Sequence, residues 1–399
     1  MKTAINKMYY CKHFIKEVYM RDETKFLEKK ERIIQTIQRK NTKKPALVLD
    51  ADTYYPVMAG VAPEDVRTFD DALAVMDKVM ELLDYDSAAC TYMPPNICTQ
   101  PMLDALGGGT FIVKDYYKMQ DPAKVAIMHE DEYTLLAKDP ANFIMGTLLP
   151  RRYTAFAEDK SFEEKMAGVL GAFQAGGGLQ AYQPQIVEHG THLMCTGFAQ
   201  VPVDYIFVYY RELKGMLIDV KRRPQQIAEA SQALFELQKP MLMANQMTAT
   251  PDTTVFMPLT LPSFLSPREF EKIYWPTMKA SAELQTGLGI NICYSLERDW
   301  HRLYDYLKEL PKTGITSFFE NDDIRTVKKE LGDVMAIGGG ISTDLLGIGT
   351  KEECVDCVKS LVDDIGPTGL MIRPNRNMLY PTDGKPENMI AVAEYVHSL

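Results

Sequence analysis

The chain has 399 residues, 46% of them hydrophobic and 25% charged, which is enough apolar material for one large globular domain or two smaller ones. Its formal net charge of −10 argues against nucleic acid or an anionic membrane surface as the main partner. No run of roughly 18 apolar residues occurs, so we expect no membrane-spanning helix.

The seven cysteines are odd in number and scattered along the chain, which indicates reduced thiols rather than a disulfide framework. Lys2 and Lys7 are not followed by the apolar core that a secretory signal contains. We therefore expect a cytoplasmic protein.

The first residues, 1–40, are charged and end in an amphipathic segment at 29–38, which predicts an N-terminal helical extension. The apolar run Ala46–Leu49 is typical of a buried strand and carries Asp50 and Asp52 into the loop after it. The segment Glu64–Asp84 has apolar residues spaced by three and four, which predicts a long amphipathic helix.

The middle of the chain is less regular, with helices expected at 161–175 and from about 225 to 237. Between them, Glu188-His189-Gly190-Thr191-His192 lies in a glycine-containing loop, and its residue types suit metal binding or acid–base chemistry. Two histidines three residues apart do not make a zinc motif by themselves. A structural role for His192 therefore stays open beside a catalytic one.

The last third of the chain alternates short apolar runs with helical segments, a pattern typical of parallel βαβ units. Gly338-Gly339-Gly340 ends one run, either as a phosphate-binding loop or as a tight turn. In such folds the loops after the strands hold the chemistry. The runs are 255–259, 290–293, 316–319, 334–337 and 369–372.

Polar side chains accompany the ends of these runs. Cys293 and Glu297 lie at or just beyond one run, Glu320 follows the next, and Asn375 follows the last. If the ends converge on one opening, the thiol and the two carboxylates could share a zinc ion. The alternative is two solvated glutamates and a small core cysteine.

Several stretches resemble the uroporphyrinogen decarboxylase superfamily: AIGGGISTDLLGIGTKEECVDCVKSLVDDIGPTGLMIRP, YPTDGKPENMIAVAEYV and FLSPREFEKIYWPTMKA. The resemblance implies an α/β fold, a (β/α)8 TIM barrel over residues 41–399, preceded by the helical extension at 1–40. MHEDEYTLLAKDPANF and DVKRRPQQIAEA resemble the longer, methyltransferase-like members. The superfamily includes methyltransferases that work with cobalamin-binding proteins.

Departures from the family pattern narrow the expected reaction. Decarboxylases of this family place an arginine-bearing RQAGR stretch at the first strand, whereas this chain reads LVLDADTYYP, and its aspartates would repel a polycarboxylate tetrapyrrole. Thiol-methylating members bind zinc through His-x-Cys and a later cysteine, of which only Cys293 is present. Longer members often carry a glutamate before an Arg-Leu pair, as Glu297 precedes Arg302-Leu303.

The resemblance therefore implies a methyltransferase that moves a methyl group from a methoxyaromatic or methylamine donor to the Co(I) of a corrinoid protein. This is the O-demethylation step of anaerobic one-carbon metabolism. Breaking an ether bond needs a proton or a Lewis-acid metal at the leaving oxygen. We expect Glu297, His192 and Asp50 to be catalytic, and Cys293, Glu297 and Glu320 to hold zinc. The expected donor-binding residues are Tyr54, Tyr294, Trp300 and Asn375.

Two alternatives stay open at this point. A decarboxylase or lyase acting on a small carboxylic acid would grip its substrate with Arg373, Arg376 or Arg152. A non-catalytic barrel would bind a corrinoid or a partner protein. Whether the chain forms a homodimer is also open.

Overall fold

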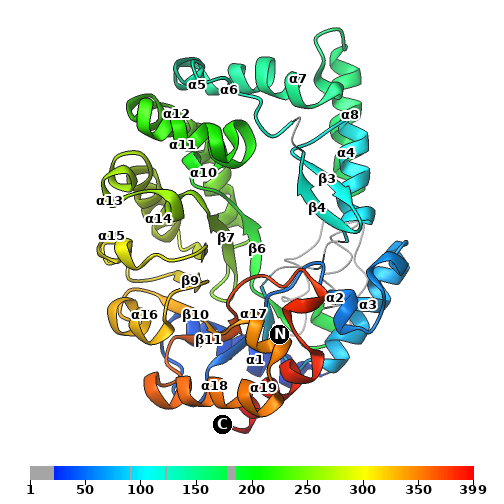
Figure 1. Ribbon diagram of the computed structural model, residues 1–399, viewed down its shortest axis with the longest axis vertical. Coiled ribbons are helices and arrows are strands. Elements are labelled where there is room, and N and C mark those ends of the chain that lie inside the picture. The colour runs from blue at the N-terminus through cyan, green and yellow to red at the C-terminus, as the bar shows by residue number, and fades with distance from the viewer. Residues whose placement is uncertain (1–21, 90–91, 93, 122–123, 178–185) are drawn as a thin grey trace.

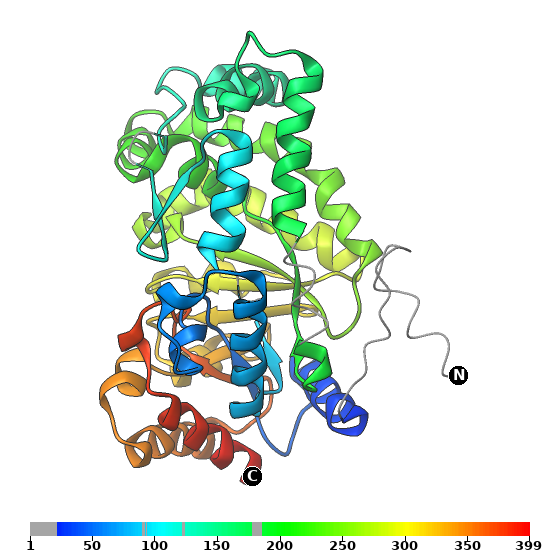
Figure 2. The same cartoon turned by 90° about the vertical axis from the view of Figure 1, so that its right-hand side faces the viewer.

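A parallel sheet of nine strands curls into a barrel at the centre of the computed structural model, as Figure 1 and Figure 2 show from two sides. The structure describes residues 22–89, 92, 94–121, 124–177 and 186–399. In chain order the barrel strands are β1 (Ala46–Leu49), β2 (Ser87–Ala88), β5 (His192–Leu193), β6 (Cys195–Phe198), β7 (Thr254–Leu259), β8 (Asn291–Leu296), β9 (Ile315–Phe319), β10 (Ala336–Ile341) and β11 (Leu370–Pro374).

The barrel closes through Met194, the residue between β5 and β6. Its backbone N–H donates to Ala88 O at 3.1 Å, and its carbonyl accepts from Thr254 N at 2.7 Å. Residues 192–198 therefore act as one strand that pairs with β2 on one side and β7 on the other. The result is the eight strand positions of a (β/α)8 barrel. The predicted TIM-barrel fold is confirmed.

Side chains alternate between the barrel interior and the layer beneath the helices, as the pleat of a strand requires. One buried cluster holds interior residues such as Val48, Cys293, Phe318 and Met371. Residues next to them in the strands, such as Leu49, belong to the larger core between sheet and helices. This alternation decides which predicted site residues can reach the opening at the carboxyl ends of the strands, which we call the mouth.

Helix α1 (Glu23–Ile37) covers the end of the barrel where the strands begin. It contacts β1, β2 and β5, and Ile33 and Ile37 join the interior cluster. Arg32 pairs with Asp86, which directly precedes β2. The helix predicted near the N-terminus is therefore present and packed against the barrel.

Most of the other helices surround the barrel or follow its strands. They are α2 (Tyr55–Met58), α3 (Phe69–Leu82), α13 (Pro267–Glu269), α14 (Trp275–Gly287), α15 (Tyr304–Leu307), α16 (Ile324–Leu331), α17 (Thr343–Ile348), α18 (Lys351–Ile365) and α19 (Pro386–Ser398). No helix in the described part of the chain has both the length and the apolarity needed to cross a membrane.

Two long insertions leave from the carboxyl ends of β2 and β6. In Figure 1 helices α5, α6, α7 and α8 of the first insertion lie uppermost, beyond the barrel. The first contains α4 (Gln100–Leu106), the hairpin β3 (Phe111–Lys114) and β4 (Tyr117–Gln120), α5 (Tyr133–Lys138), α6 (Pro140–Phe143), α7 (Leu149–Arg152) and α8 (Phe162–Gly177). The second contains α10 (Pro202–Ile206), α11 (Glu212–Arg222) and α12 (Pro224–Ala244).

Element boundaries differ from the predictions where a cap intervenes. The helix expected from Glu64 begins only at Phe69, because Thr68 and Asp71 form a capping box, with the Asp71 carboxylate accepting from Thr68 N at 2.8 Å. The helix expected at 225–237 continues to Ala244. The strand expected at 290–293 continues to Leu296.

Gly338, Gly339 and Gly340 lie inside β10, so both the phosphate-loop and the turn interpretations were wrong. Gly338 faces Phe318 and Arg373: a Cβ there would overlap the Phe318 ring and lie 3.1 Å from Cδ of Arg373. The glycine is needed for close packing inside the barrel.

We expect Gly338→Ala to lower the free energy of unfolding by about 1–3 kcal/mol, because the ring and the guanidinium must both shift. Denaturant unfolding of the purified variant measures this loss. Gly287→Ala is the matched control, since nothing lies within 4 Å of the Cβ that it adds. Equal stability of the two variants would contradict the packing account.

Candidate active site at the barrel mouth

The carboxyl ends of the strands carry a ring of polar side chains. Glu297 follows β8, Glu320 follows β9, and Asn375 follows β11. Phe198, at the end of β6, pairs in register with the interior residue Phe256 and is 53% exposed. An inward aromatic ring with that exposure indicates that the mouth is open to solvent.

Glu297 is the central acid of this ring. Its Oε1 accepts a hydrogen bond from Thr260 Oγ1 at 2.8 Å. Burial raises the pKa of the Glu297 carboxyl, the bond from Thr260 lowers it in part, and the negative charge of Glu320 raises it further. A carboxyl of this kind keeps its proton to a higher pH than an ordinary glutamate, which suits a general acid.

The turn after Glu297 is fixed from both sides. Arg298 has a left-handed φ of 61°, and its N–H donates to Glu320 Oε2 at 2.6 Å. Trp300 Nε1 donates to Glu297 O at 3.1 Å. Such a backbone conformation is costly for a residue other than glycine, and it persists here because the bonds around it hold the turn. Glu297 and Glu320 are thereby kept side by side.

Asp204 is a fully buried acid that the sequence analysis missed. It lies in α10, accepts from Leu261 N at 2.8 Å, and accepts from the hydroxyl of Tyr274. Burial raises its pKa to about 7, hydrogen bonds from Tyr274 and Leu261 oppose the rise, and the charge of Glu297 adds to it. Asp204 thus lies behind the Thr260–Glu297 pair, at the same end of the barrel.

This burial predicts a pH-dependent stability. In the folded protein Asp204 keeps its proton up to about pH 7, whereas the unfolded chain releases it near 3.8. Relative to Asp204→Asn, the wild type should therefore lose unfolding free energy as the pH rises from about 4 to about 7, by up to about 4 kcal/mol. Urea unfolding of both proteins at pH 4 to 8 measures the difference. Parallel curves would contradict it.

Asp50 and Arg373 form an ion pair inside the barrel, just below the mouth. Their side chains are 5% and 2% exposed, and Asn377 Nδ2 donates to Asp50 Oδ1 at 2.8 Å. The Arg373 guanidinium also lies 4.3 Å from the centroid of the Phe318 ring. The Asp50 carboxylate is therefore paired with the Arg373 guanidinium, and this guanidinium is not free to bind another anion. The sequence predicted separate roles for these residues, Asp50 as a catalytic acid and Arg373 as a possible grip for a substrate carboxylate.

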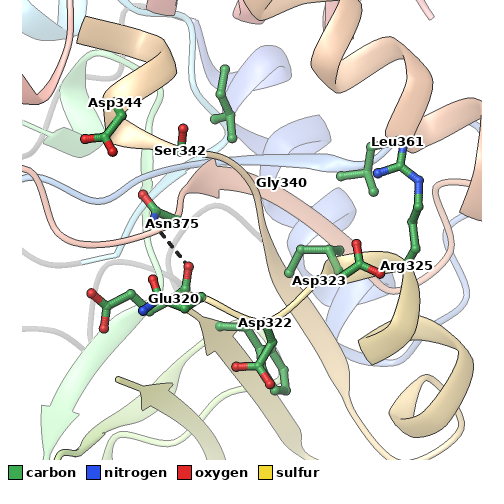
Figure 3. Close-up of a pocket in the computed structure, with 13 residues that line it drawn as sticks. Glu320, Asp322, Asp323, Arg325, Gly340, Ser342, Asp344, Leu361 and Asn375 are labelled. Atoms are coloured by element: carbon green, nitrogen blue, oxygen red, sulfur yellow. Dashed lines mark hydrogen bonds between the residues drawn. The ribbon is translucent and has the colours of Figure 1, made fainter. Parts of the chain in front are cut away.

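Asn375 ties the loops after three strands together. Its Nδ2 donates to Glu320 O at 3.2 Å, and its Oδ1 accepts from Thr343 N at 2.9 Å. It borders a cavity of about 510 Å³ at the edge of the mouth, shown in Figure 3. The charged residues of its lining are one arginine, Arg325, and four acids: Glu320, Asp322, Asp323 and Asp344.

The three aromatic residues expected to bind the donor are all fully buried. Tyr54 donates from its hydroxyl to Gly384 O at 2.5 Å, joining the loops after β1 and β11. Tyr294 lies in the core between sheet and helices. Trp300 packs against Phe270 and donates to the backbone of Glu297. These three side chains pack behind the residues of the mouth, and none of their rings lines the mouth.

His192 lies at the opposite end of the barrel, at the start of β5. Its Nε2 is 2.8 Å from Asp252 Oδ2, and Lys30 of α1 also pairs with Asp252 at 3.1 Å. His189 pairs with Asp77 of α3 at 2.7 Å. The two histidines thus point to different partners, and His192 stays apart from Glu297.

Cys293 is also apart from the two glutamates. It is buried in the barrel interior, four residues before Glu297 along β8, or about 13 Å at the usual strand rise. Among the residues that the structure describes, no group of three or more His, Cys, Asp or Glu side chains could hold a metal ion. The ligand set Cys293, Glu297 and Glu320 therefore does not fit a shared zinc.

The family model for uroporphyrinogen decarboxylase (URO-D) matches residues 185–399, which is more than half of the chain. The chain belongs to the URO-D family. No curated protein sequence matches it. Among solved structures it is similar to a methyltransferase from Methanosarcina mazei, with 13% identity and a TM-score of 0.59, over 93% of this chain and 98% of that chain. At this identity the likeness supports the shared fold alone.

The URO-D match places the candidate site in the family's own part of the chain. It spans every barrel strand from β5 to β11, and with them Asp204, Glu297, Glu320 and Arg373. The candidate site therefore lies within the URO-D match, and the insertion between β2 and β5 lies almost wholly outside it.

Proposed function

We propose that this URO-D family member is a methyltransferase that takes a methyl group from a small methoxyaromatic donor and passes it to the Co(I) of a corrinoid held by a partner protein. The observation that carries the proposal is the half-buried, hydrogen-bonded carboxyl of Glu297 beside Glu320 at an open barrel mouth. The similarity to a methyltransferase structure supports it further.

The reaction breaks the bond between the methyl carbon and the ether oxygen. The corrinoid, when its protein is docked, would supply the nucleophile that accepts the methyl group. An ether oxygen leaves poorly as an anion, so it needs a proton as charge develops on it. We assign this proton to Glu297, whose pKa is raised by burial and by Glu320. The product is a phenol, and Glu297 recovers its proton from solvent.

Each surrounding residue has a role in holding that acid. Thr260 fixes one carboxyl oxygen, and Trp300 holds the backbone at Glu297. Asp204 and Tyr274 fix the start of the loop that carries Thr260 through the bond to Leu261 N. A methylamine donor with a quaternary nitrogen leaves as a neutral amine and needs no such proton. The protonated acid therefore favours an ether.

A decarboxylase or lyase acting on a small carboxylic acid is less well supported. Two of the three arginines considered for gripping acids are already paired: Arg373 with Asp50, and Arg376 with Asp383 at 2.8 Å. Binding a substrate carboxylate there would mean breaking an existing ion pair.

Incubation of the purified protein with Co(I) cobalamin and a panel of methoxybenzenes and methylamines tests the proposal. We expect release of the demethylated phenol from at least one ether donor. Folded protein that demethylates nothing on the panel, but releases carbon dioxide from small acids without cobalamin, would overturn it in favour of a lyase.

A further inference from the structure

Arg152, at the end of α7, is a buried cation with no acidic partner among the residues that the structure describes. Arg152 is only 3% exposed to solvent. Its Nε and Nη2 donate to Lys124 O, both at 3.3 Å, and Nη2 also donates to Tyr209 O. Its side chain also bonds that of Tyr153, and no carboxylate accepts from it in the described part of the chain. These bonds hold the guanidinium in place but leave its charge unneutralised.

Four tyrosines surround this guanidinium. Arg152 lies 5.9 Å from the centroid of the Tyr153 ring, and the rings of Tyr205 and Tyr209 are 4.7 Å apart. Tyr210 packs edge-on against Tyr205 at 5.4 Å. Tyr153, Tyr205 and Tyr209 are each only half-buried, so the cluster reaches the protein surface. We call Arg152 with these four residues the Arg152 cluster.

The cluster lies on the same side of the barrel as Glu297. Tyr205 follows Asp204 directly in α10, and Asp204 binds the backbone of Leu261 just beyond β7. Figure 1 places α10 above the ends of β6 and β7. Tyr209 and Tyr210 continue the same helical segment, Phe207–Arg211, and bring it to α7 through the bond to Arg152.

An unpaired buried charge is costly, so buried cations in proteins are as a rule paired with an acid or a ligand. Burial lowers the pKa of Arg152, and the groups that oppose this are tyrosines, not carboxylates. Arginine and phenolic O–H groups are both donors, which suits a carboxylate. The flat rings beside them suit an aromatic ligand.

We propose that the Arg152 cluster binds the carboxylate of an aromatic acid, with the guanidinium and tyrosine hydroxyls as donors and the tyrosine rings as the apolar wall. Figure 1 shows α7 beyond the barrel, away from the strand ends that carry Glu297, so this ligand site is distinct from the proposed general acid. A cationic ligand would be repelled by the same arginine.

Calorimetric titration without cobalamin tests the site directly, with 4-methoxybenzoate and neutral methoxybenzene as probes. We expect the wild type to bind the acid, and Arg152→Met to weaken this binding by about 10- to 100-fold, the value of a charged hydrogen bond. Binding of methoxybenzene should change little. Arg222→Met, at an exposed position of α11, is the control and should leave both affinities unchanged.

Two further variants keep the test decisive if Arg152→Met fails to fold. Arg152→Lys should retain part of the affinity for the acid, and Tyr153→Phe should lower it by removing one donor. Equal affinity of wild type and folded variants for 4-methoxybenzoate, or equal binding of acid and neutral ether by the wild type, would overturn the proposal. Acid binding by the wild type that Arg152→Met weakens would support the site whether or not the protein demethylates an ether.

Discussion

Replacing Glu297 by glutamine should lower kcat for demethylation of a methoxybenzene by about 100- to 10,000-fold, because the leaving oxygen loses its proton donor. KM should change little, since the amide keeps the bond to Thr260. In the wild type, kcat should fall as the pH rises through the raised pKa of Glu297, because only the protonated form can donate. Steady-state rates of phenol release between pH 5 and 9 measure both effects.

Glu394→Gln is the matched control for this prediction, because Glu394 is exposed on α19, away from the mouth. It should retain wild-type rates throughout. Glu320→Gln should shift the fall in kcat to lower pH, since removing the neighbouring charge lowers the pKa of Glu297. A Glu297→Gln variant with wild-type kcat, or a wild-type rate that rises with pH, would exclude Glu297 as the acid.

Breaking the Asp50–Arg373 pair should produce the largest loss of stability of any change described here. Asp50→Leu leaves the Arg373 cation buried without its partner, which costs about 3–5 kcal/mol. Arg373→Met should cost a similar amount, because it leaves the Asp50 carboxylate with only the bond from Asn377. Urea unfolding of both purified variants against the wild type measures these losses.

The double variant Asp50→Leu, Arg373→Met separates pairing from packing. Removing both charges also removes the desolvation cost, so the double variant should be more stable than either single variant. The surface ion pair of Arg325 and Asp364, with side chains 43% and 52% exposed, is the control for the buried pair. Breaking that pair should cost less than about 1 kcal/mol. Additive losses in the Asp50–Arg373 cycle would contradict a coupled buried pair.

The sequence predicted the barrel strands that are long and apolar. Ala46–Leu49 and the runs behind β7 to β11 were recognised because both faces of such strands are buried. β2 was missed because Ser87–Ala88 is only two residues long. Residues 192–198 were missed because they contain His192, Thr196 and Gly197, and their pairing is decided by closure of the barrel through Met194.

The missed strand also explains the prediction for His192. We expected functional side chains at the carboxyl ends of strands, which requires the strand boundaries to be known. His192 lies at the start of β5, at the opposite end of the barrel. The same argument placed Glu297, Glu320 and Asn375 at the carboxyl ends of β8, β9 and β11, where the structure has them. Cys293 was placed near the mouth because β8 was predicted to end there, three residues too early.

Other parts of the site depend on contacts between distant segments. Asp50 and Arg373 meet because the first and last strands of the barrel are neighbours, which a local pattern does not reveal. Asp204 could have been recognised, since it is a lone acid within the apolar segment Val201–Val208. An acid in such a segment is expected to be buried and to have an altered pKa.

We infer that Glu297 holds a proton at the barrel mouth because its carboxyl is half-buried beside Glu320. Carbon-13 NMR of glutamate carboxyls, with the Glu297 signal assigned by its loss in Glu297→Gln, measures the titration directly and needs neither donor nor corrinoid. We predict a midpoint above the ordinary value of about 4.3, and a lower midpoint in Glu320→Gln. A Glu297 midpoint at or below the ordinary value would contradict the account.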